Sequence, residues 1–540
     1  MVRVLQPNPY DCFIVFILFF MASLNNVGQL TEVRIKDFKN YLPLMLIIGL
    51  SLLLRFFIIG HQSLWYDEGM SLYYADSQTI QEALLKILGR EAGDKYQPLY
   101  YLLLFYWRAA FGETEFALRS FSAILGVGSV IVLYLATFNL YGKKHAIWSS
   151  LLLACSSFSI YYSQEARPYS LLIFLTVTQV YFLSHLINQR QPKFINKLLL
   201  AVFTAIGCLG SILLSFFSIA LCLAHLLVYK NFKQWLRIWL LPFIFSSPIL
   251  WFYLSSPAAQ NPTITAVTRA NLPIIQNIFF VIYGIFVGTT YGPPLTQLRG
   301  EDKLSVIFNY LPQLTILLSI ILIILISLLN ILLKTYFGKK YQHYHQLDLL
   351  FTFTIVISFA IALIFTLKTQ LNWLPRHSFY LCIPLVILLP SILSNGWRKY
   401  CKIAMIFLII LNLYSISHHY FNQAYWRDDY RSAAYYLIKN REPDAKSIIL
   451  QGNTILLKHY GDMQTIDGWQ YLKQLEQKNF AELIQKITDN SPTVFIVINR
   501  EHTLGNNPKE KLQQAMSNLY VLNKQVSYQY ITLYRFNQRT

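Results

Sequence analysis

Leu42–Gly69 reads LPLMLIIGLSLLLRFFIIGHQSLWYDEG, an apolar run that ends in an acidic pair. The run from Leu42 to Ile59 is long enough to cross a bilayer. Asp67 and Glu68 follow it within a few residues, directly behind a Trp-Tyr pair of the kind found at membrane–water interfaces. Taken alone, the acidic pair fits either a solvated loop after a helix or an interfacial functional site.

The composition places the whole chain in a membrane. Of its 540 residues, 55% are hydrophobic and 13% are charged, and the mean hydropathy is +0.41. Soluble domains carry roughly 25% charged residues, so membrane lipids are the expected surroundings. The formal charge of +19 comes largely from Lys and Arg in short loops between apolar runs. That distribution indicates membrane topology, and we therefore expect no nucleic-acid partner.

The cysteines and acidic residues favour no cofactor. The six cysteines form no CxxC pair, which argues against a disulfide scaffold or a thiolate metal site. A divalent metal is conceivable, but no HExxH-like spacing supports one. Residues 1–41 are predicted to be a cytoplasmic or interfacial segment. Its run Phe13–Leu24 is too short to span a bilayer and fits a signal-like remnant, an interfacial helix or a misassigned start.

The basic loops predict the topology. Basic clusters begin at Arg34, Lys143, Arg190, Lys230, Lys334 and Arg398. If all of them are cytoplasmic, Asp67 lies outside. We predict about 11 transmembrane helices, near residues 42–60, 121–141, 145–162, 169–187, 198–213, 214–229, 238–254, 311–333, 348–367, 378–394 and 403–418.

Three further apolar stretches do not fit as spans. Pro98–Phe111 is too short and carries Arg108, so it is predicted to lie in the outer interface as a juxtamembrane helix. The amphipathic stretch Ile80–Leu88 is its expected neighbour. Ile274–Val287 is assigned to a long outer loop, Ser255–Tyr310.

An odd number of spans sends the C-terminus outside. Residues 421–540 are polar enough for one small, extracytoplasmic α/β domain. The pattern predicts strands at 447–450, 493–498 and 530–536, and helices at 431–439, 469–487 and 508–519. The predicted domains are therefore 1–41, a catalytic membrane domain at 42–420 whose first extracytoplasmic loop is 61–120, and 421–540.

Under this topology the outer face collects ionisable and aromatic groups at helix boundaries. After the Asp67–Glu68 pair come QPLYY at 97–101, EFALRS at 115–120, YYSQEARPY at 161–169 and PRHSFY at 375–380. Ionisable residues at such places are functional candidates, although each arginine alone also fits an interfacial anchor or a snorkelling side chain.

The order and spacing of these pieces resemble the polyprenyl-phosphate-dependent GT-C glycosyltransferases, in particular the protein O-mannosyltransferase and aminoarabinose transferase group. The resemblance covers residues 42–190 most clearly and the rest through topology. Relatives usually carry Lys-Pro-Pro-Leu or His-Pro-Pro-Leu where this chain has Tyr96-Gln97-Pro98-Leu99. The basic or imidazole group of that position is absent here, which puts a phosphate or metal role there in doubt.

The resemblance implies a polyprenyl-phosphate sugar donor and a glycan, lipid or protein acceptor, used outside a plasma (inner) membrane. It implies that Asp67 is the general base and that Glu68 assists at the catalytic position. The implied substrate-binding residues are Tyr66, Gln97, Arg119, Glu165, Arg167, Tyr169, Arg376 and His377. Two alternatives stay open: Glu165 could pair with Arg167 as scaffolding, and His377 could cap a helix. A transporter or flippase is the competing class of function.

Overall fold

The computed structural model describes residues 35–89, 93–187, 193–255, 274–294, 297, 303–337, 342–369, 373–394, 398–440, 442–461, 465–475, 479–501 and 507–539. The interpretation of the first 34 residues lies outside this part of the chain. The described residues divide into two compact units. A helical unit takes in 35–57, 74–293 and 307–418, and a C-terminal unit takes in 58–73, 294–306 and 419–540. Sequence analysis predicted a membrane domain at 42–420, so the two divisions differ at 58–73, 294–306 and 419–420.

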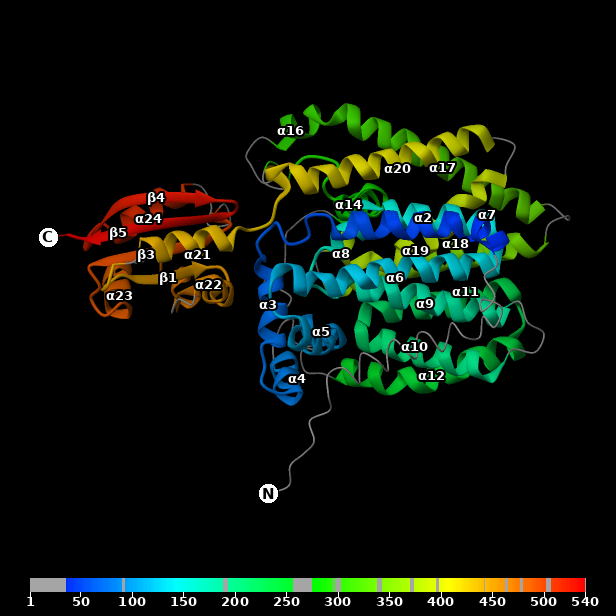
Figure 1. The fold of residues 1–540 in the computed structure, drawn as a ribbon, viewed down its shortest axis with the longest axis horizontal. Coiled ribbons are helices and arrows are strands. Elements are labelled where there is room, and N and C mark those ends of the chain that lie inside the picture. The colour runs from blue at the N-terminus through cyan, green and yellow to red at the C-terminus, as the bar shows by residue number, and fades with distance from the viewer. Residues whose placement is uncertain are drawn as a thin grey trace, which may run out of the picture. The chain divides into compact units, whose positions relative to one another are not determined.

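The helical unit is built from long apolar helices joined by short ones (Figure 1). Its elements are α2 (Ile35–Phe56), α4 (Ile80–Leu88), η1 (Gly93–Tyr96), α5 (Pro98–Phe111), α6 (Glu115–Tyr141), α7 (Lys143–Cys155), α8 (Ser157–Ser163), α9 (Tyr169–Ile187), α10 (Phe194–Gly210), α11 (Ile212–Tyr229), α12 (Phe232–Ser255), α14 (Ile274–Val287), α17 (Leu311–Phe337), α18 (Gln342–Thr369), η4 (Pro375–Leu381), α19 (Cys382–Leu388), η5 (Leu389–Ser394) and α20 (Arg398–Phe421). Two elements, α3 (Tyr66–Ala75) and α16 (Lys303–Asn309), cross the border between the units.

Helices α6, α9, α10 and α12 lie side by side in that order (Figure 1). Helix α9 is buried along almost its whole length, so it forms the centre of this layer. Peripheral helices instead expose large apolar side chains, such as Trp251 at 74% and Leu254 at 67% on α12. Apolar exposure on this scale is expected of a surface that faces lipid rather than water.

Six described helices are long and apolar enough to cross a membrane. They are Glu115–Tyr141, Tyr169–Ile187, Ile212–Tyr229, Phe232–Ser255, Gln346–Lys368 and Lys399–Phe421. Shorter apolar helices cover Leu42–Phe56, Phe194–Gly210, Gln276–Val287 and Leu311–Ser327. The helical membrane fold is therefore confirmed, and the full count of about 11 spans remains a prediction.

Two predicted spans are broken rather than continuous, and one predicted loop is helical. Between α7 and α8, Ser156 is extended (φ −62°, ψ 114°) and its side chain accepts the N–H of Ser159, which starts a new helix. The predicted span 378–394 consists of η4, α19 and η5. The stretch Ile274–Val287, assigned to a loop, forms the apolar helix α14.

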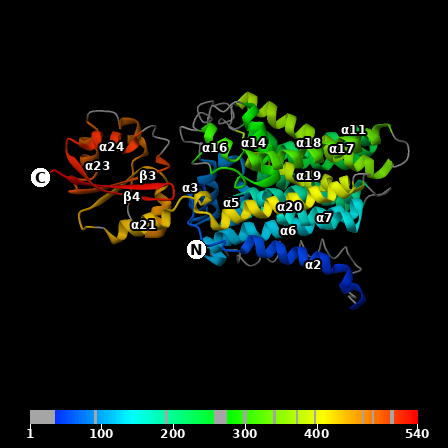
Figure 2. The same cartoon turned by 90° about the horizontal axis from the view of Figure 1, so that it is seen from above.

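The C-terminal unit contains a five-stranded sheet in the order β2-β1-β3-β5-β4. Its elements are η6 (Gln423–Tyr425), α21 (Tyr430–Lys439), β1 (Lys446–Gln451), α22 (Thr454–Gly461), β2 (Ile466–Asp467), η7 (Trp469–Gln474), α23 (Phe480–Ile487), β3 (Thr493–Asn499), α24 (Pro508–Met516), β4 (Tyr520–Tyr528) and β5 (Ile531–Gln538). Strands β2, β1 and β3 are parallel, and β5 is antiparallel to both β3 and β4. Figure 2 shows α23 and α24 on one face of this sheet and α21 on the other.

The predicted α/β domain is confirmed, with differences in detail. Strands β1, β3 and β5 lie where the sequence predicts them. The predicted helix 469–487 is instead the short η7 followed by α23. Strand β4 was missed because it lies at the sheet edge, where the polar run Asn523–Gln525 needs no core partner.

Candidate functional site

The acid-pair loop, residues His61–Gly69, runs into the first turn of α3. Glu68 is completely buried: its Oε2 accepts the backbone N–H of Trp65 at 3.3 Å, and its Oε1 lies 3.9 Å from Nη1 of Arg427. Buried carboxylates are tolerated when they are paired and hydrogen-bonded. Glu68 therefore anchors the loop, whereas Asp67 is only half-buried. Of the two predicted catalytic carboxylates, Asp67 is the more exposed.

A second carboxylate, which the sequence analysis did not single out, organises the helical unit. Asp94 lies in η1 and is only 8% exposed. Its Oδ1 accepts hydrogen bonds from Arg167 Nη2 at 3.1 Å, Tyr101 Oη at 2.6 Å and Gln97 Nε2 at 3.2 Å. Its Oδ2 accepts one from Tyr74 Oη at 3.2 Å. We call these five residues the Asp94 cluster.

Within the Asp94 cluster, the buried carboxylate of Asp94 compensates the positive charge of Arg167. Burial alone raises the pKa of Asp94, but the charge of Arg167 and the hydrogen bonds outweigh it, so that pKa falls below its usual value. Asp94 is therefore ionised at neutral pH, and its negative charge compensates the positive charge of Arg167. Gln97, the residue after Tyr96 in the Tyr96-Gln97-Pro98-Leu99 motif, supplies a neutral donor to the same carboxylate.

The break between α7 and α8 is held by a fully buried arginine. Arg55 comes from the last turn of α2. Its Nη1 donates to Ala154 O at 3.1 Å, and its Nη2 donates to Leu153 O at 3.2 Å and to Ser159 Oγ at 2.9 Å. These carbonyls end α7, where helical partners are missing. Arg55 therefore caps α7 from a neighbouring helix.

Gln164 in turn caps the end of α2. Its Nε2 donates to Arg55 O at 3.1 Å and to Phe57 O at 2.9 Å, both at the end of α2. Gly126 of α6 packs against Arg55 and Ser163, next to these caps. A Cβ there would stand 2.2 Å from Ser163 Oγ and 2.8 Å from Arg55 Nε, so only glycine fits. The Arg55–Gln164 cap positions the turn 164–168, which carries Glu165 and Arg167.

Glu165 lies within that turn, and Tyr169 directly follows it. Glu165 is 1% exposed and Tyr169 is 6% exposed. The Tyr169 ring packs against Tyr162 at 4.7 Å between centroids, and Tyr162 interacts electrostatically with both Glu165 and Arg376. The structure thus brings the motif around Arg167 near the motif around Arg376. The ion pair shown for Arg167 is the one with Asp94, and pairing with Glu165 stays a hypothesis.

The remaining predicted residues have distinct surroundings. His377 Nδ1 accepts the backbone N–H of Leu374 at 3.3 Å, which is the capping role left open by the sequence. Arg376 is half-buried. Arg119 is only 1% exposed, which does not fit a side chain that snorkels to water. Tyr66 is 38% exposed in the acid-pair loop.

The predicted residues therefore fall into two groups. Tyr66, Asp67 and Glu68 belong to the C-terminal unit, and the others belong to the helical unit. Sequence reasoning missed Asp94, Arg55, Arg427 and Arg500. A signal existed for Asp94, which is an acid three residues before the quoted QPLYY motif.

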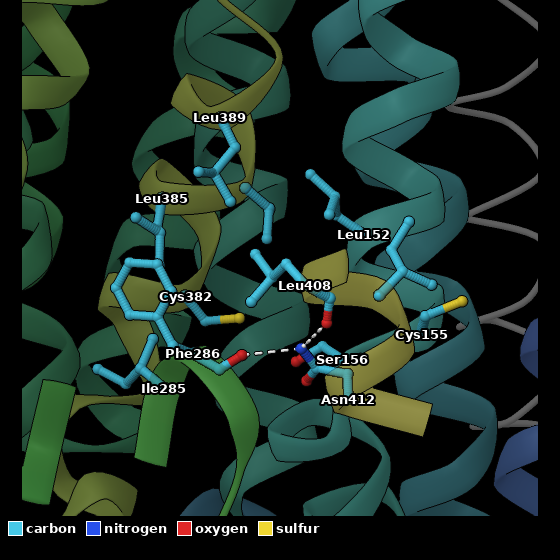
Figure 3. A pocket seen from close by; sticks show the side chains of 12 residues that line it. Leu152, Cys155, Ser156, Ile285, Phe286, Cys382, Leu385, Leu389, Leu408 and Asn412 are labelled. Atoms are coloured by element: carbon cyan, nitrogen blue, oxygen red, sulfur yellow. Dashed lines mark hydrogen bonds between the residues drawn. The ribbon is translucent and has the colours of Figure 1, made fainter. Parts of the chain in front are cut away.

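A cavity in the helical unit is too small to be the substrate site. It has a volume of about 20 Å³, room for roughly one water molecule. Aliphatic side chains of α7, α14, α19 and α20 line it, with Asn412 at one end (Figure 3). Asn412 Nδ2 donates to Phe286 O and Leu408 O, and its Oδ1 accepts the N–H of Ser157 at 2.8 Å. The cavity thus belongs to a helix junction.

Residues of the types that bind metal ions do not cluster in the part of the chain that the structure describes. There, no group of three or more His, Cys, Asp or Glu residues could hold a metal ion. Asp94 is surrounded by donors from Arg, Tyr and Gln, which leave its oxygens engaged.

The fold defines a class, a polytopic helical membrane protein with a small α/β domain at its C-terminus. Residues 97–252 match the family model described as dolichyl-phosphate-mannose-protein mannosyltransferase. This stretch contains Gln97, Arg119, Glu165, Arg167 and Tyr169. No significant match was found among the sequences of curated proteins.

Solved structures share the fold across nearly the whole chain. ArnT from Cupriavidus metallidurans, bound to undecaprenyl phosphate, is 13% identical with a TM-score of 0.52, covering 92% of this chain and 98% of its own. The apo oligosaccharyltransferase of Archaeoglobus fulgidus is 12% identical with a TM-score of 0.53, covering 91% and 74%. Its complex with Zn and sulfate has a TM-score of 0.50 at 13% identity, with coverage of 91% and 72%. These matches show that the chain shares the GT-C fold with these proteins.

Proposed function

We propose that this protein is an integral membrane glycosyltransferase that moves a sugar from a polyprenyl-phosphate donor to an acceptor hydroxyl. The observation that carries the proposal is the match of residues 97–252 to the mannosyltransferase family model. The fold shared with ArnT, a protein solved with undecaprenyl phosphate bound, supports the same class of donor.

Asp67 is proposed as the general base. The acceptor oxygen attacks the anomeric carbon, the bond between that carbon and the phosphate oxygen breaks, and Asp67 takes the hydroxyl proton. The lipid phosphate leaves with the bonding electron pair. Asp67 suits this role because it is half-buried at the start of a helix, whereas Glu68 is sealed in an ion pair with Arg427. Glu68 then orients the base rather than taking the proton.

The leaving phosphate stays negative and needs fixed cations, for which arginine is well suited. We assign direct phosphate contact to Arg376 first, then to Arg167 and Arg119. Two observations support this order. Arg376 is only half-buried, and the charge of Arg167 is already compensated by Asp94. Substrate contacts would be completed by Tyr66, Gln97, Glu165, Tyr169 and His377.

The acceptor is a glycan, lipid or protein, and the active face is proposed to lie outside a plasma (inner) membrane. The basic loops support this orientation, since placing them in the cytoplasm puts Asp67 outside.

The test is transfer by the purified protein in lipid bilayers, offered a panel of radiolabelled polyprenyl-phosphate sugars and an extract of its source membrane. Wild type is compared with Asp67→Asn. The matched control is Asp444→Asn, because Asp444 is exposed in the same C-terminal unit. We expect wild type and the control to move label into a larger product. Asp67→Asn should lower the rate on the order of a hundredfold to ten-thousandfold.

Two results would overturn the proposal. If the folded wild-type protein consumes no donor, the proposed transferase activity is ruled out. If the folded Asp67→Asn protein transfers sugar at the wild-type rate, Asp67 is not the general base. Uptake of label without transfer would favour the transporter alternative.

A further inference from the structure

Side chains from the far end of the chain hold the acid-pair loop. The backbone N–H of Leu64 donates to Tyr460 Oη at 2.8 Å. The backbone carbonyl of Tyr66 accepts Asn453 Nδ2 at 3.0 Å. A Cβ on Gly69 would lie 2.5 Å from Asn453 Nδ2, so the loop and the domain approach too closely for any side chain there. The loop is thus folded as part of the C-terminal unit.

Two of the residues around this loop follow neighbouring parallel strands. Asn453 comes shortly after β1, and Arg500 comes directly after β3. The carboxyl ends of parallel strands meet at one edge of a sheet, the place where α/β domains bind ligands. Here that edge receives a loop of the same chain that bears the proposed base.

Arg500 adopts a backbone conformation that non-glycine residues rarely accept. Its φ is 55°, in the left-handed region, and its N–H donates to Tyr530 O at 2.6 Å. Such strain persists only where the surroundings enforce it and is concentrated at functional sites.

The side chain of Arg500 joins the domain to the loop. Its Nε and Nη2 each lie 3.4 Å from an oxygen of Asp428, which is 1% exposed. Its guanidinium carbon stands 5.6 Å from the centroid of the Trp65 ring, two residues before Asp67. Burial alone lowers the pKa of Arg500, but the charges of Asp428 and then Asp67 outweigh it and raise that pKa.

We propose that Arg500 is a positioning residue for the base: it stacks on Trp65 and places its charge beside Asp67, so that the C-terminal domain orients the catalytic carboxylate. This proposal rests on the proposed function of Asp67. It also gives that domain a direct part in catalysis, beyond covering a site or recognising an acceptor.

The test measures transfer by the full-length protein carrying Arg500→Ala, with Arg539→Ala as the control, since Arg539 is exposed in the same domain. We expect kcat to fall about tenfold to a hundredfold for Arg500→Ala, because small misplacements of a catalytic group slow the reaction by such factors. The KM for the lipid-linked donor should change less than about threefold, since Arg500 is not argued to contact it. The control should match wild type.

Three readouts separate positioning from a merely structural role. Arg500→Lys should recover part of the rate, because lysine keeps the charge but lacks the planar face. Added guanidinium ions should partly rescue Arg500→Ala, an effect that a misfolded protein would not show. Trp65→Leu should slow transfer as well, and the double variant should be no slower than the slower single variant. If Arg500→Ala does not fold, Arg500→Lys and Trp65→Leu carry the test.

The two proposals fail in different ways. If wild type transfers sugar and Asp67→Asn does not, the proposed function stands. Wild-type kcat in folded Arg500→Ala, or strictly additive losses with Trp65→Leu, would then overturn the role of Arg500 alone.

Discussion

The acid-pair loop and the turn 164–168 carry similar chemistry but are held in different ways. The turn is positioned by helix capping, in which Arg55 of α2 satisfies backbone carbonyls at the end of α7, and Gln164, at the end of α8, satisfies backbone carbonyls at the end of α2. The loop is positioned by side chains nearly four hundred positions away in sequence, with a separation of 396 between Leu64 and Tyr460. Both segments sit at helix boundaries, and each carries ionisable residues.

This difference indicates which substitutions would disturb each segment. The turn depends on satisfied backbone groups in a buried helix junction, where each unmet carbonyl is expensive. The loop depends on side-chain contacts with an α/β domain, so substitutions in the last 120 residues or so can disturb it without touching a membrane helix. Variants that affect one segment and spare the other therefore test this comparison.

The largest effect is expected for Arg55→Met. Removing the guanidinium takes a charged donor from Ala154 O, Leu153 O and Ser159 Oγ in a buried site, where Leu153 O keeps only the Ser156 N–H, and we expect a loss of about 4 kcal/mol. The apparent melting temperature of the purified protein in detergent checks this. Normal stability would show that the cap is dispensable and that the turn is held by other contacts.

Asp94→Asn should follow, with a loss of about 3 kcal/mol at neutral pH, because it leaves the charge of Arg167 buried without its partner. The depressed pKa of Asp94 sets the pH dependence. The unfolded state binds the proton more readily, so the stabilisation is present above the ordinary pKa of about 4 and is lost as pH falls through the folded value. Melting temperatures of wild type and variant should stay apart from pH 7 to about 5 and converge below about 4. A gap that widened on acidification would contradict the assignment.

Gly69→Ala should disturb only the loop. The added methyl would meet Asn453 Nδ2 at 2.5 Å and Leu456 Cγ at 2.7 Å, and overpacking of this kind costs about 2 kcal/mol. Gly49→Ala is the matched control, since nothing lies within 4 Å of a Cβ there. Thermal unfolding should show a loss for Gly69→Ala and no loss for Gly49→Ala. Equal behaviour of the two would mean that the loop does not approach the domain this closely.

The smallest effects distinguish the two regions through single hydroxyl groups. Tyr460→Phe removes the acceptor of the Leu64 N–H, and Tyr74→Phe removes a donor to Asp94. Each should lower stability by about 1 kcal/mol. Combined, the two losses should add, because the hydroxyl groups serve separate networks. Marked non-additivity in a double-mutant cycle would show that the networks are coupled.

Much of the fold was predictable because its signals are local. The amphipathic α4 and the short apolar α5 begin and end where the sequence predicts, since hydrophobic periodicity and length report on a single helix. The broken spans were not predictable in the same way. Ser156 inside an apolar run looks like an ordinary small residue, and only its capping bond to Ser159 marks the end of α7.

The site divides in the same manner. Asp67, Arg167 and Arg376 could be singled out because charged residues at the end of an apolar run are uncommon. Asp94 was missed because it does not end an apolar run, although it lies three residues before the QPLYY motif, and its importance comes from the donors gathered around it. Asp428 lies just before a predicted helix, and nothing in the sequence distinguishes it from Asp429. Its neighbour Asp429 does cap α21, whereas Asp428 pairs with Arg500.

The sequence by itself determined a helical membrane protein, the position of its apolar helices and the residues with chemistry to offer. These properties follow from composition and from periodicities only a few residues long. Tertiary structure alone decided that Arg167 pairs with Asp94, that Arg55 caps a neighbouring helix and that Arg500 stands over Trp65. Such partners are separated by tens to hundreds of residues, and they meet only because packing brings distant elements together, which no local pattern encodes.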